Sequence, residues 1–200
     1  MSLKHYFSKE PRSVDLFGEV GTLKEFNKRL LKLSKLLPKE NKEVWGRNKN
    51  AIENENKIKG AGFELFCELF CFHFGYSPQI GIIDYEPINP SEDEGIDGRC
   101  KNLNEEPSAV QCKFVADRVF LFSTENSNIS NFLNEATIQD IDWKNGAIKK
   151  LFFITTGKGL HYHTIEKLND RVKVINGYII SLFVDNNLPF WNSCSRKLRE

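Results

Sequence analysis

Three polar residues occur in apolar segments at a spacing that would let their side chains meet. Asp97 lies in the segment EGIDG at residues 94–98, and Gln111 and Lys113 lie in VQCKF at residues 110–114. Because alternate side chains of a strand share a face, Gln111 and Lys113 project together, away from the core side. An unpaired ammonium group out of water costs on the order of several kcal/mol, so Lys113 needs a partner. Asp97, on the preceding strand of the predicted hairpin, is the natural partner.

Glu64 is a fourth candidate, at the border of an apolar helix face. The segment after Gly60 and Gly62 predicts this helix, because its large apolar side chains share one face: Phe63, Phe66, Cys67, Phe70 and Phe74. Gly75 is well placed to end the helix. Glu64 falls about 100° around the helix from Phe63. A carboxylate at such a border can point along the core surface into a cleft.

Two carboxylates and an ammonium group suit the hydrolysis of a phosphodiester. Carboxylates hold a hard divalent cation, and a nearby ammonium group polarises a phosphate oxygen or orients water. Gly95 and Gly98, on either side of the Ile-Asp pair, would let a DNA backbone approach closely. The residue types therefore predict metal-dependent chemistry on a phosphodiester.

The order of these segments resembles a known nuclease family. The segments GFE at 62–64, GY at 75–76, GIDG at 95–98 and VQCK at 110–113 resemble the PD-(D/E)XK, or restriction-endonuclease-like, superfamily. They are most similar to its Mrr-like branch, which has Gln-x-Lys in place of Glu-x-Lys. FFITT at 152–156 and VING at 174–177 extend the likeness from about Gly60 to Asn186. The resemblance implies a Mg²⁺-dependent DNA endonuclease that leaves 5′-phosphate ends, with Mn²⁺ as a substitute ion.

The resemblance also implies a role for each candidate. Asp97 would be the central metal ligand, and Glu64 would support it directly or through water. Gln111 would take the place of the second carboxylate, the backbone carbonyl of Cys112 would complete the metal shell, and Lys113 would position or help to activate the attacking water. The chain departs from the family pattern where Ile96 replaces a proline, as is common in this branch. It departs again at Gln111, a neutral ligand that lowers the affinity for the metal.

The remaining periodicity predicts an α/β fold with a mixed central sheet flanked by helices, a restriction-endonuclease-like core. Thr22 is expected to cap the first helix with Glu25, and Pro38 to end it. Predicted strands cover 79–86, 95–100, 108–114, 151–155 and 172–175, and predicted helices cover 22–37, 63–74, 128–141, 163–168 and 178–184. We expect a helical N-terminal extension at 1–58, a nuclease core at 59–187 and a polar tail or linker at 188–200.

Basic residues and histidines outside the predicted centre are candidate DNA contacts. Residues 1–60 hold 14 Lys or Arg against 8 Asp or Glu, whereas the remainder is net acidic, which fits a protein that binds a polyanion. The lysines on the first helix form either a phosphate-contacting ridge or a solvated face, and the histidines are either cleft or ordinary surface residues. The candidates are Arg99, Lys101, Lys158, His161, His163, Lys28 and Lys32.

Composition and cysteine spacing limit the class of protein. The chain is 40% hydrophobic and 28% charged, with 16 Phe, which favours a globular fold. Its five cysteines form no CxxC pair, so we expect reduced, buried thiols. The spacing of Cys67, Cys71 and His73 could suit a zinc ion, but both cysteines lie on the apolar helix face, so we expect them to pack in the core. No apolar run reaches the ~20 residues of a membrane span, and residues 1–10 lack a secretory signal. We therefore expect a cytoplasmic protein without membrane contact.

Several alternatives stay open at the level of sequence. DNA is the expected partner, but a nuclease-like fold could instead serve only to bind DNA or a partner protein. A homodimer is compatible with the sequence, and so is a nuclease module linked to, or associated with, a helicase. No Walker-type GxxxxGK[ST] occurs in these 200 residues, so any motor would lie outside them.

Overall fold

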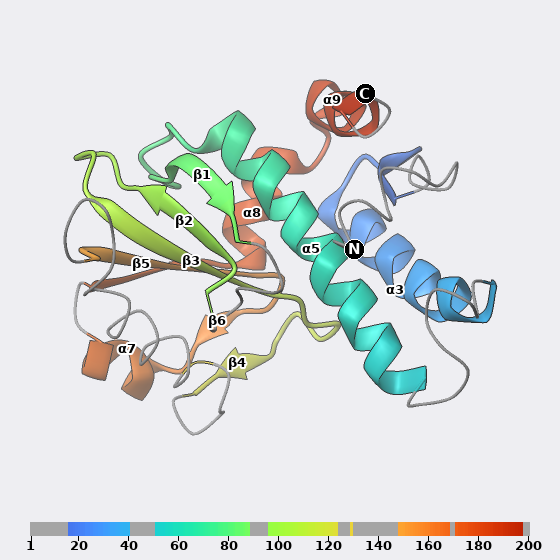
Figure 1. Ribbon diagram of the computed structural model, residues 1–200, viewed down its shortest axis with the longest axis horizontal. Helices are drawn as coiled ribbons and strands as arrows, with labels where there is room; N and C mark the ends of the chain where they lie inside the picture. The colour runs from blue at the N-terminus through green and yellow to red at the C-terminus, as the bar shows by residue number, and fades with distance from the viewer. Residues whose placement is uncertain are drawn as a thin grey trace. The chain divides into compact units, whose positions relative to one another are not determined.

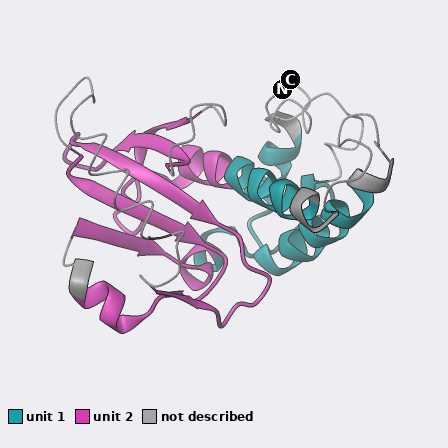
Figure 2. Ribbon diagram, turned by 60° about the horizontal axis from the view of Figure 1, so that its bottom comes forward, with its two compact units in different colours: residues 1–66, 181–200 teal, residues 67–180 magenta. Residues whose placement is uncertain are grey.

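The computed structural model describes residues 16–40, 51–88, 96–123, 129, 148–168 and 171–197 (Figure 1). The chain divides into two compact units, residues 1–66 with 181–200, and residues 67–180 (Figure 2). The division falls inside two helices, α5 (Ala51–Phe74) and α8 (Gly177–Val184). It therefore differs from the boundaries at 59 and 187 that the sequence predicts.

The first unit begins with a capped helix, α3 (Leu23–Glu40). Thr22 Oγ1 accepts a hydrogen bond from the Glu25 amide at 3.2 Å, and the Glu25 carboxylate accepts one from the Gly21 amide at 2.9 Å. These bonds lower the pKa of Glu25, the Gly21 bond most, and they confirm the predicted start. The predicted end at Pro38 is wrong by two residues, because a proline in the last turn removes one hydrogen bond without breaking the turns before it.

Aromatic rings and a close helix approach form the core of the first unit. The rings that pack together, with centroids 4.7 to 6.4 Å apart, belong to Phe17, Phe26, Phe63, Phe66, Phe190 and Trp191. A Cβ on Gly62 would lie 2.4 Å from Leu30 Cδ1, so glycine lets α5 approach α3. Gly60 and Gly62 thus lie inside α5, which begins at Ala51 rather than after them.

The predicted tail at 188–200 is wrong for residues 188–197, which form helix α9 (Leu188–Lys197). Asn187 Oδ1 caps this helix by accepting a hydrogen bond from the Phe190 amide at 3.2 Å. Trp191 Nε1 donates to the Val184 carbonyl at 2.8 Å, and Phe190, Trp191 and Cys194 are buried. The apolar stripe of three residues anchors a segment whose other residues are mostly polar.

The second unit contains a five-stranded mixed sheet in the order β1-β2-β3-β5-β7. Figure 1 labels the first four of these strands. β1, β2 and β3 are antiparallel neighbours, whereas β3, β5 and β7 run parallel. The strands are β1 (Ile83–Pro87), β2 (Gly98–Lys101), β3 (Pro107–Lys113), β5 (Lys150–Thr155) and β7 (Val172–Ile175). This sheet and its helices confirm the predicted α/β class with a mixed central sheet.

Smaller elements complete the second unit. A parallel two-stranded sheet pairs β4 (Leu121–Phe122) with β6 (Gly159–Leu160), and helix α7 (Tyr162–Leu168) follows. The first predicted strand begins at Ile83 rather than Gln79, because residues 77–80 form a turn in which the Ile80 amide donates to the Ser77 carbonyl. The predicted helix at 128–141 lies outside the described residues, apart from Ile129.

Strand register decides which side chains share a face of the sheet. Gln111 pairs with Phe153 and Lys113 with Thr155, while Val110 pairs with Gly98. Gln111 and Lys113 therefore project from the same face, as the sequence predicts.

None of the helices among the described residues has both the length and the hydropathy of a membrane span.

Candidate active site

Hydrogen bonds from β3 fix the Asp97 carboxylate. The Asp97 amide donates to the Val110 carbonyl at 3.0 Å, and the Asp97 carbonyl accepts from the Ile88 amide at 3.1 Å. The carboxylate oxygen Oδ2 accepts from Gln111 Nε2 at 2.5 Å and from the Cys112 amide at 2.6 Å. The half-buried carboxylate is thus oriented by one side chain and one backbone amide of the same strand.

The hydrogen bond from Gln111 to Asp97 explains why a polar residue occupies this buried strand. Its side chain is 2% exposed, and its amide nitrogen meets the Asp97 carboxylate. A glutamate here would bring two carboxylates together, and like charges at that distance repel each other unless a proton or a cation lies between them. A neutral amide at this position avoids this repulsion and donates a hydrogen bond to the Asp97 carboxylate instead.

The pairing of Lys113 differs from the prediction. Lys113 is half-buried at the end of β3, two residues beyond Gln111 and on the same face. Within the described part of the chain it forms no ion pair with Asp97, so the predicted pairing is wrong. Asp97 Oδ2 is engaged by Gln111 and Cys112, and the long Lys113 stem can carry its ammonium group to water.

The opposite face of the sheet supports the site with neutral groups. Burial raises the pKa of the Cys67 thiol well above its usual value, and a hydrogen bond with Cys112 and the charge of Asp97 add to the effect. Burial also raises the pKa of Tyr85, with smaller effects of nearby thiols and Asp97. These groups stay neutral at physiological pH beside the Asp97 charge. All five cysteines are buried and free, which confirms the predicted reduced thiols.

Gly98 gives Tyr85 the space for its ring. A Cβ on Gly98 would lie 2.4 Å from Tyr85 Cε2, so the sheet needs glycine here for packing. From the sequence, Gly95 and Gly98 are predicted to let DNA approach closely. Gly95 lies outside the described residues. Among the described residues, the buried Tyr85 hydroxyl has no hydrogen-bond partner. Sequence reasoning missed Tyr85, although the alternation Ile83, Asp84, Tyr85, Glu86 predicts an inward-facing tyrosine.

Replacing Gly98 with alanine is expected to destabilise the protein by about 1–3 kcal/mol, because the added methyl group must displace the Tyr85 ring. Urea unfolding measures the loss. Gly21→Ala is the matched control, since its Cβ would meet Glu25 Oε2 at an ordinary 3.5 Å. Equal stability of the two variants would refute the packing role of Gly98.

Glu64 belongs to the first unit, whereas Asp97, Gln111 and Lys113 belong to the second. Glu64 is half-buried in α5, three residues before Cys67, and its Oε1 lies 3.6 Å from the position of a Cβ on Gly60. The structure brings Asp97 and Gln111 together and places Lys113 on their face of the sheet. The role of Glu64 in this site stays a prediction of the sequence.

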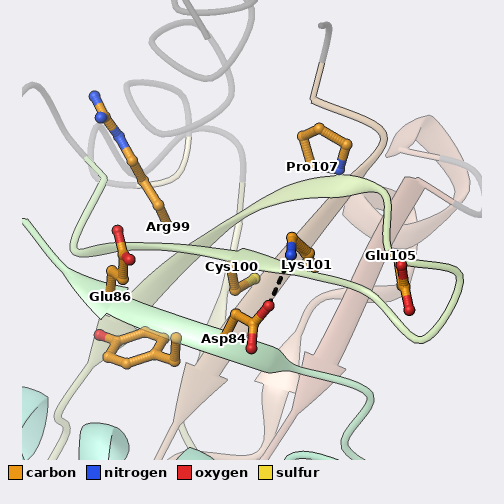
Figure 3. Close-up of a pocket in the computed structure, with 8 residues that line it drawn as sticks. Asp84, Glu86, Arg99, Cys100, Lys101, Glu105 and Pro107 are labelled. Carbon is orange, nitrogen blue, oxygen red and sulfur yellow. Dashed lines mark hydrogen bonds and ion pairs between the residues drawn. The ribbon is translucent and has the colours of Figure 1, made fainter. Parts of the chain in front are cut away.

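Arg99 and Lys101 line a cavity of about 510 Å³ together with acidic residues (Figure 3). Lys101 Nζ donates to Asp84 Oδ2 at 2.8 Å, and this bond raises the pKa of Lys101. Glu86 and Glu105 also line the cavity. Three carboxylates beside two cations give this cavity a net negative charge, which weakens the case for a phosphate contact here.

The other candidate DNA contacts lie at separate places. Lys158 and His163 are exposed, and His163 Nδ1 lies 3.6 Å from Glu166 Oε2. His161 is half-buried, and its amide donates to the Phe122 carbonyl at 2.7 Å. Lys28 and Lys32 are exposed on α3 of the first unit. The exposure of Lys28 and Lys32 is compatible both with a phosphate-contacting ridge and with a solvated helix face.

The donors around Asp97 suit a hard divalent cation. Among the described residues, no three His, Cys, Asp or Glu side chains form a group that could hold a metal ion. Magnesium nevertheless keeps several waters and is commonly bound through one or two carboxylates. The Asp97 carboxylate and the Cys112 carbonyl are oxygen ligands of the kind that magnesium prefers, so their chemistry fits the implied ion.

Comparisons of this chain with protein-family models, with curated proteins and with solved structures found no match.

Proposed function

We propose that this chain is a divalent-metal-dependent nuclease that hydrolyses the phosphodiester backbone of DNA. The proposal depends on one observation: the Asp97 carboxylate is held by Gln111 and the Cys112 amide, on the sheet face from which Lys113 also projects. The sequence resemblance to the PD-(D/E)XK superfamily supports the same residues in the same order. The restriction-endonuclease-like core is part of this proposal.

Each residue would contribute one physical effect. Asp97 and the carbonyl oxygen of Cys112 would hold Mg²⁺, which supplies Lewis-acid activation of water and of a phosphate oxygen. Gln111 and the Cys112 amide hold the carboxylate in one orientation, so little reorganisation is needed during the reaction. Lys113 would stabilise the negative charge that develops on the phosphate. Glu64 would add a second carboxylate, as the resemblance implies.

The wild-type chain is expected to convert supercoiled plasmid DNA to nicked or linear products in Mg²⁺ or Mn²⁺ and to stop when EDTA is added. Electrophoresis of the products measures the rate, and end labelling should reveal 5′-phosphates. A module that only binds nucleic acid would instead show salt-dependent affinity without any product. Binding without cleavage in either metal would therefore reject the enzymatic proposal.

Gln111→Glu is expected to lower the stability of the metal-free protein by about 1–3 kcal/mol, because a carboxylate would replace a donor to Asp97. Mg²⁺ should restore much of this loss by lying between the two charges. Thermal unfolding with and without Mg²⁺ tests both parts. Gln79→Glu, at an exposed position, is the control. If Mg²⁺ stabilises Gln111→Glu no more than wild type, the proposed metal position is wrong.

A further inference from the structure

A second cavity, of about 520 Å³, lies where the strands β5 and β7 begin. Four of its ten lining residues are cationic, Lys149, Lys150, Arg171 and Lys173, and we call it the basic pocket. Lys150 pairs with Ser108 at one end of β3, whereas Lys113 pairs with Thr155 at the other. Five residues of strand separate these pairs by roughly 17 Å, so the basic pocket is distinct from the candidate active site.

Strand register holds the cations of the basic pocket together. Phe152 pairs with Lys173, and Leu151 pairs with Val172, so Lys150 and Arg171 each directly precede the first paired position of their strands. Neighbouring strands lie only about 4.8 Å apart, which keeps these charges close to one another. The arrangement is therefore set by the sheet itself rather than by long, mobile side chains alone.

Glu106 is the single anionic residue among those that line the basic pocket. Its Oε2 accepts a hydrogen bond from Asn102 Nδ2 at 2.7 Å, within the turn between β2 and β3. The lining residues thus carry a formal net charge of +3. A phosphate ester, which carries about −1.5 to −2 at neutral pH, matches this positive charge more closely than a single carboxylate does.

Two of the cations that line the basic pocket, Lys150 and Lys173, are partly buried. Lys173 Nζ donates to the Pro78 carbonyl at 2.9 Å and would lie 3.2 Å from a Cβ on Gly81. Burial lowers the pKa of Lys173, and the charge of Lys150 lowers it further. A bound anion would relieve this repulsion, because opposite charges favour the protonated amine.

We propose that the basic pocket binds the phosphate groups of a small phosphorylated ligand, with the charge and size of a diphosphate ester, independently of the Asp97 site. Lys149 and Arg171 are exposed and would contact the outer phosphate, while Lys150 and Lys173 are partly buried. Cavities of about 300–1,000 Å³ are typical of small-ligand sites. The exposed Leu103 supplies an apolar wall for the rest of such a molecule.

Isothermal titration calorimetry in metal-free buffer tests the basic pocket without any need for cleavage. Pyrophosphate, a nucleoside diphosphate and inorganic phosphate are the probes, and the first two should bind more tightly than the third. Arg171→Gln and Lys149→Gln should each weaken binding about tenfold, the effect of one charge-assisted hydrogen bond. Arg118→Gln removes an equal charge from an exposed position of the same unit and should leave binding unchanged.

Two results would overturn the proposal. One is the absence of binding by pyrophosphate and the diphosphate, and the other is binding that neither pocket variant weakens. A DNA duplex with 5′-hydroxyl ends has no terminal phosphomonoester, so it tests contacts to the DNA backbone alone. If Arg171→Gln and Lys149→Gln weaken only the binding of this duplex, the basic pocket does not take a small phosphate ligand. Asp97→Asn should leave phosphate binding intact, so failure here is distinguishable from failure of the nuclease proposal.

Discussion

Asp97→Asn is expected to reduce DNA cleavage by about a thousandfold or more. Asparagine keeps the shape of the side chain, and its carbonyl oxygen can still accept from Gln111 Nε2 and the Cys112 amide. The change therefore removes a charge while preserving the local structure. Loss of the central metal ligand removes several kcal/mol of electrostatic stabilisation, and each 1.4 kcal/mol is about tenfold in rate. Initial rates of plasmid nicking at saturating Mg²⁺ measure the effect.

Asp84→Asn is the matched control for this experiment. Asp84 is exposed, pairs with Lys101 and has a φ of 53°, a left-handed conformation that asparagine tolerates. Its replacement should leave the cleavage rate within a factor of a few of wild type. Near wild-type cleavage by a correctly folded Asp97→Asn protein would remove Asp97 from the chemistry and with it the proposed function.

Periodicity in the sequence predicts much of the second unit, because its strands alternate between core and surface. β3 is the clearest case: Val110 and Cys112 turn to one face and Gln111 to the other, as the spacing indicates. The partner of each polar group is less predictable, because it depends on the register between strands. The amide of Gln111 reaches Asp97, whereas Lys113 lies two residues further along β3 and forms no ion pair with Asp97 among the described residues.

The first unit is harder to predict, because its core joins segments far apart in the chain. Phe17, Phe26 and Trp191 pack together although about 165 residues separate the last two. A window of residues 188–200 alone holds too few apolar residues to indicate helix α9, whose stability comes from those distant rings. The spacing of residues within the segment cannot reveal packing partners elsewhere in the chain, so the sequence of residues 188–200 predicts only a polar tail.

Lys113→Met is expected to lower the maximal cleavage rate by about 10²- to 10³-fold with little change in KM. Methionine matches the apolar stem of lysine, so the half-buried end of β3 should keep its packing. The lost ammonium group would act on charge that develops only in the transition state, and such an interaction changes kcat rather than ground-state affinity. Single-turnover cleavage over a range of DNA concentrations separates the two parameters.

Lys101→Met provides the comparison, since Lys101 also ends a strand of the same sheet but is held by Asp84. It should leave kcat near the wild-type value, because its charge is already paired away from the proposed centre. If a lysine only attracts the DNA backbone, its loss raises KM and reduces the salt dependence of binding. If Lys113→Met behaves in that way, Lys113 is a DNA contact, and the stabilising charge must come from another residue.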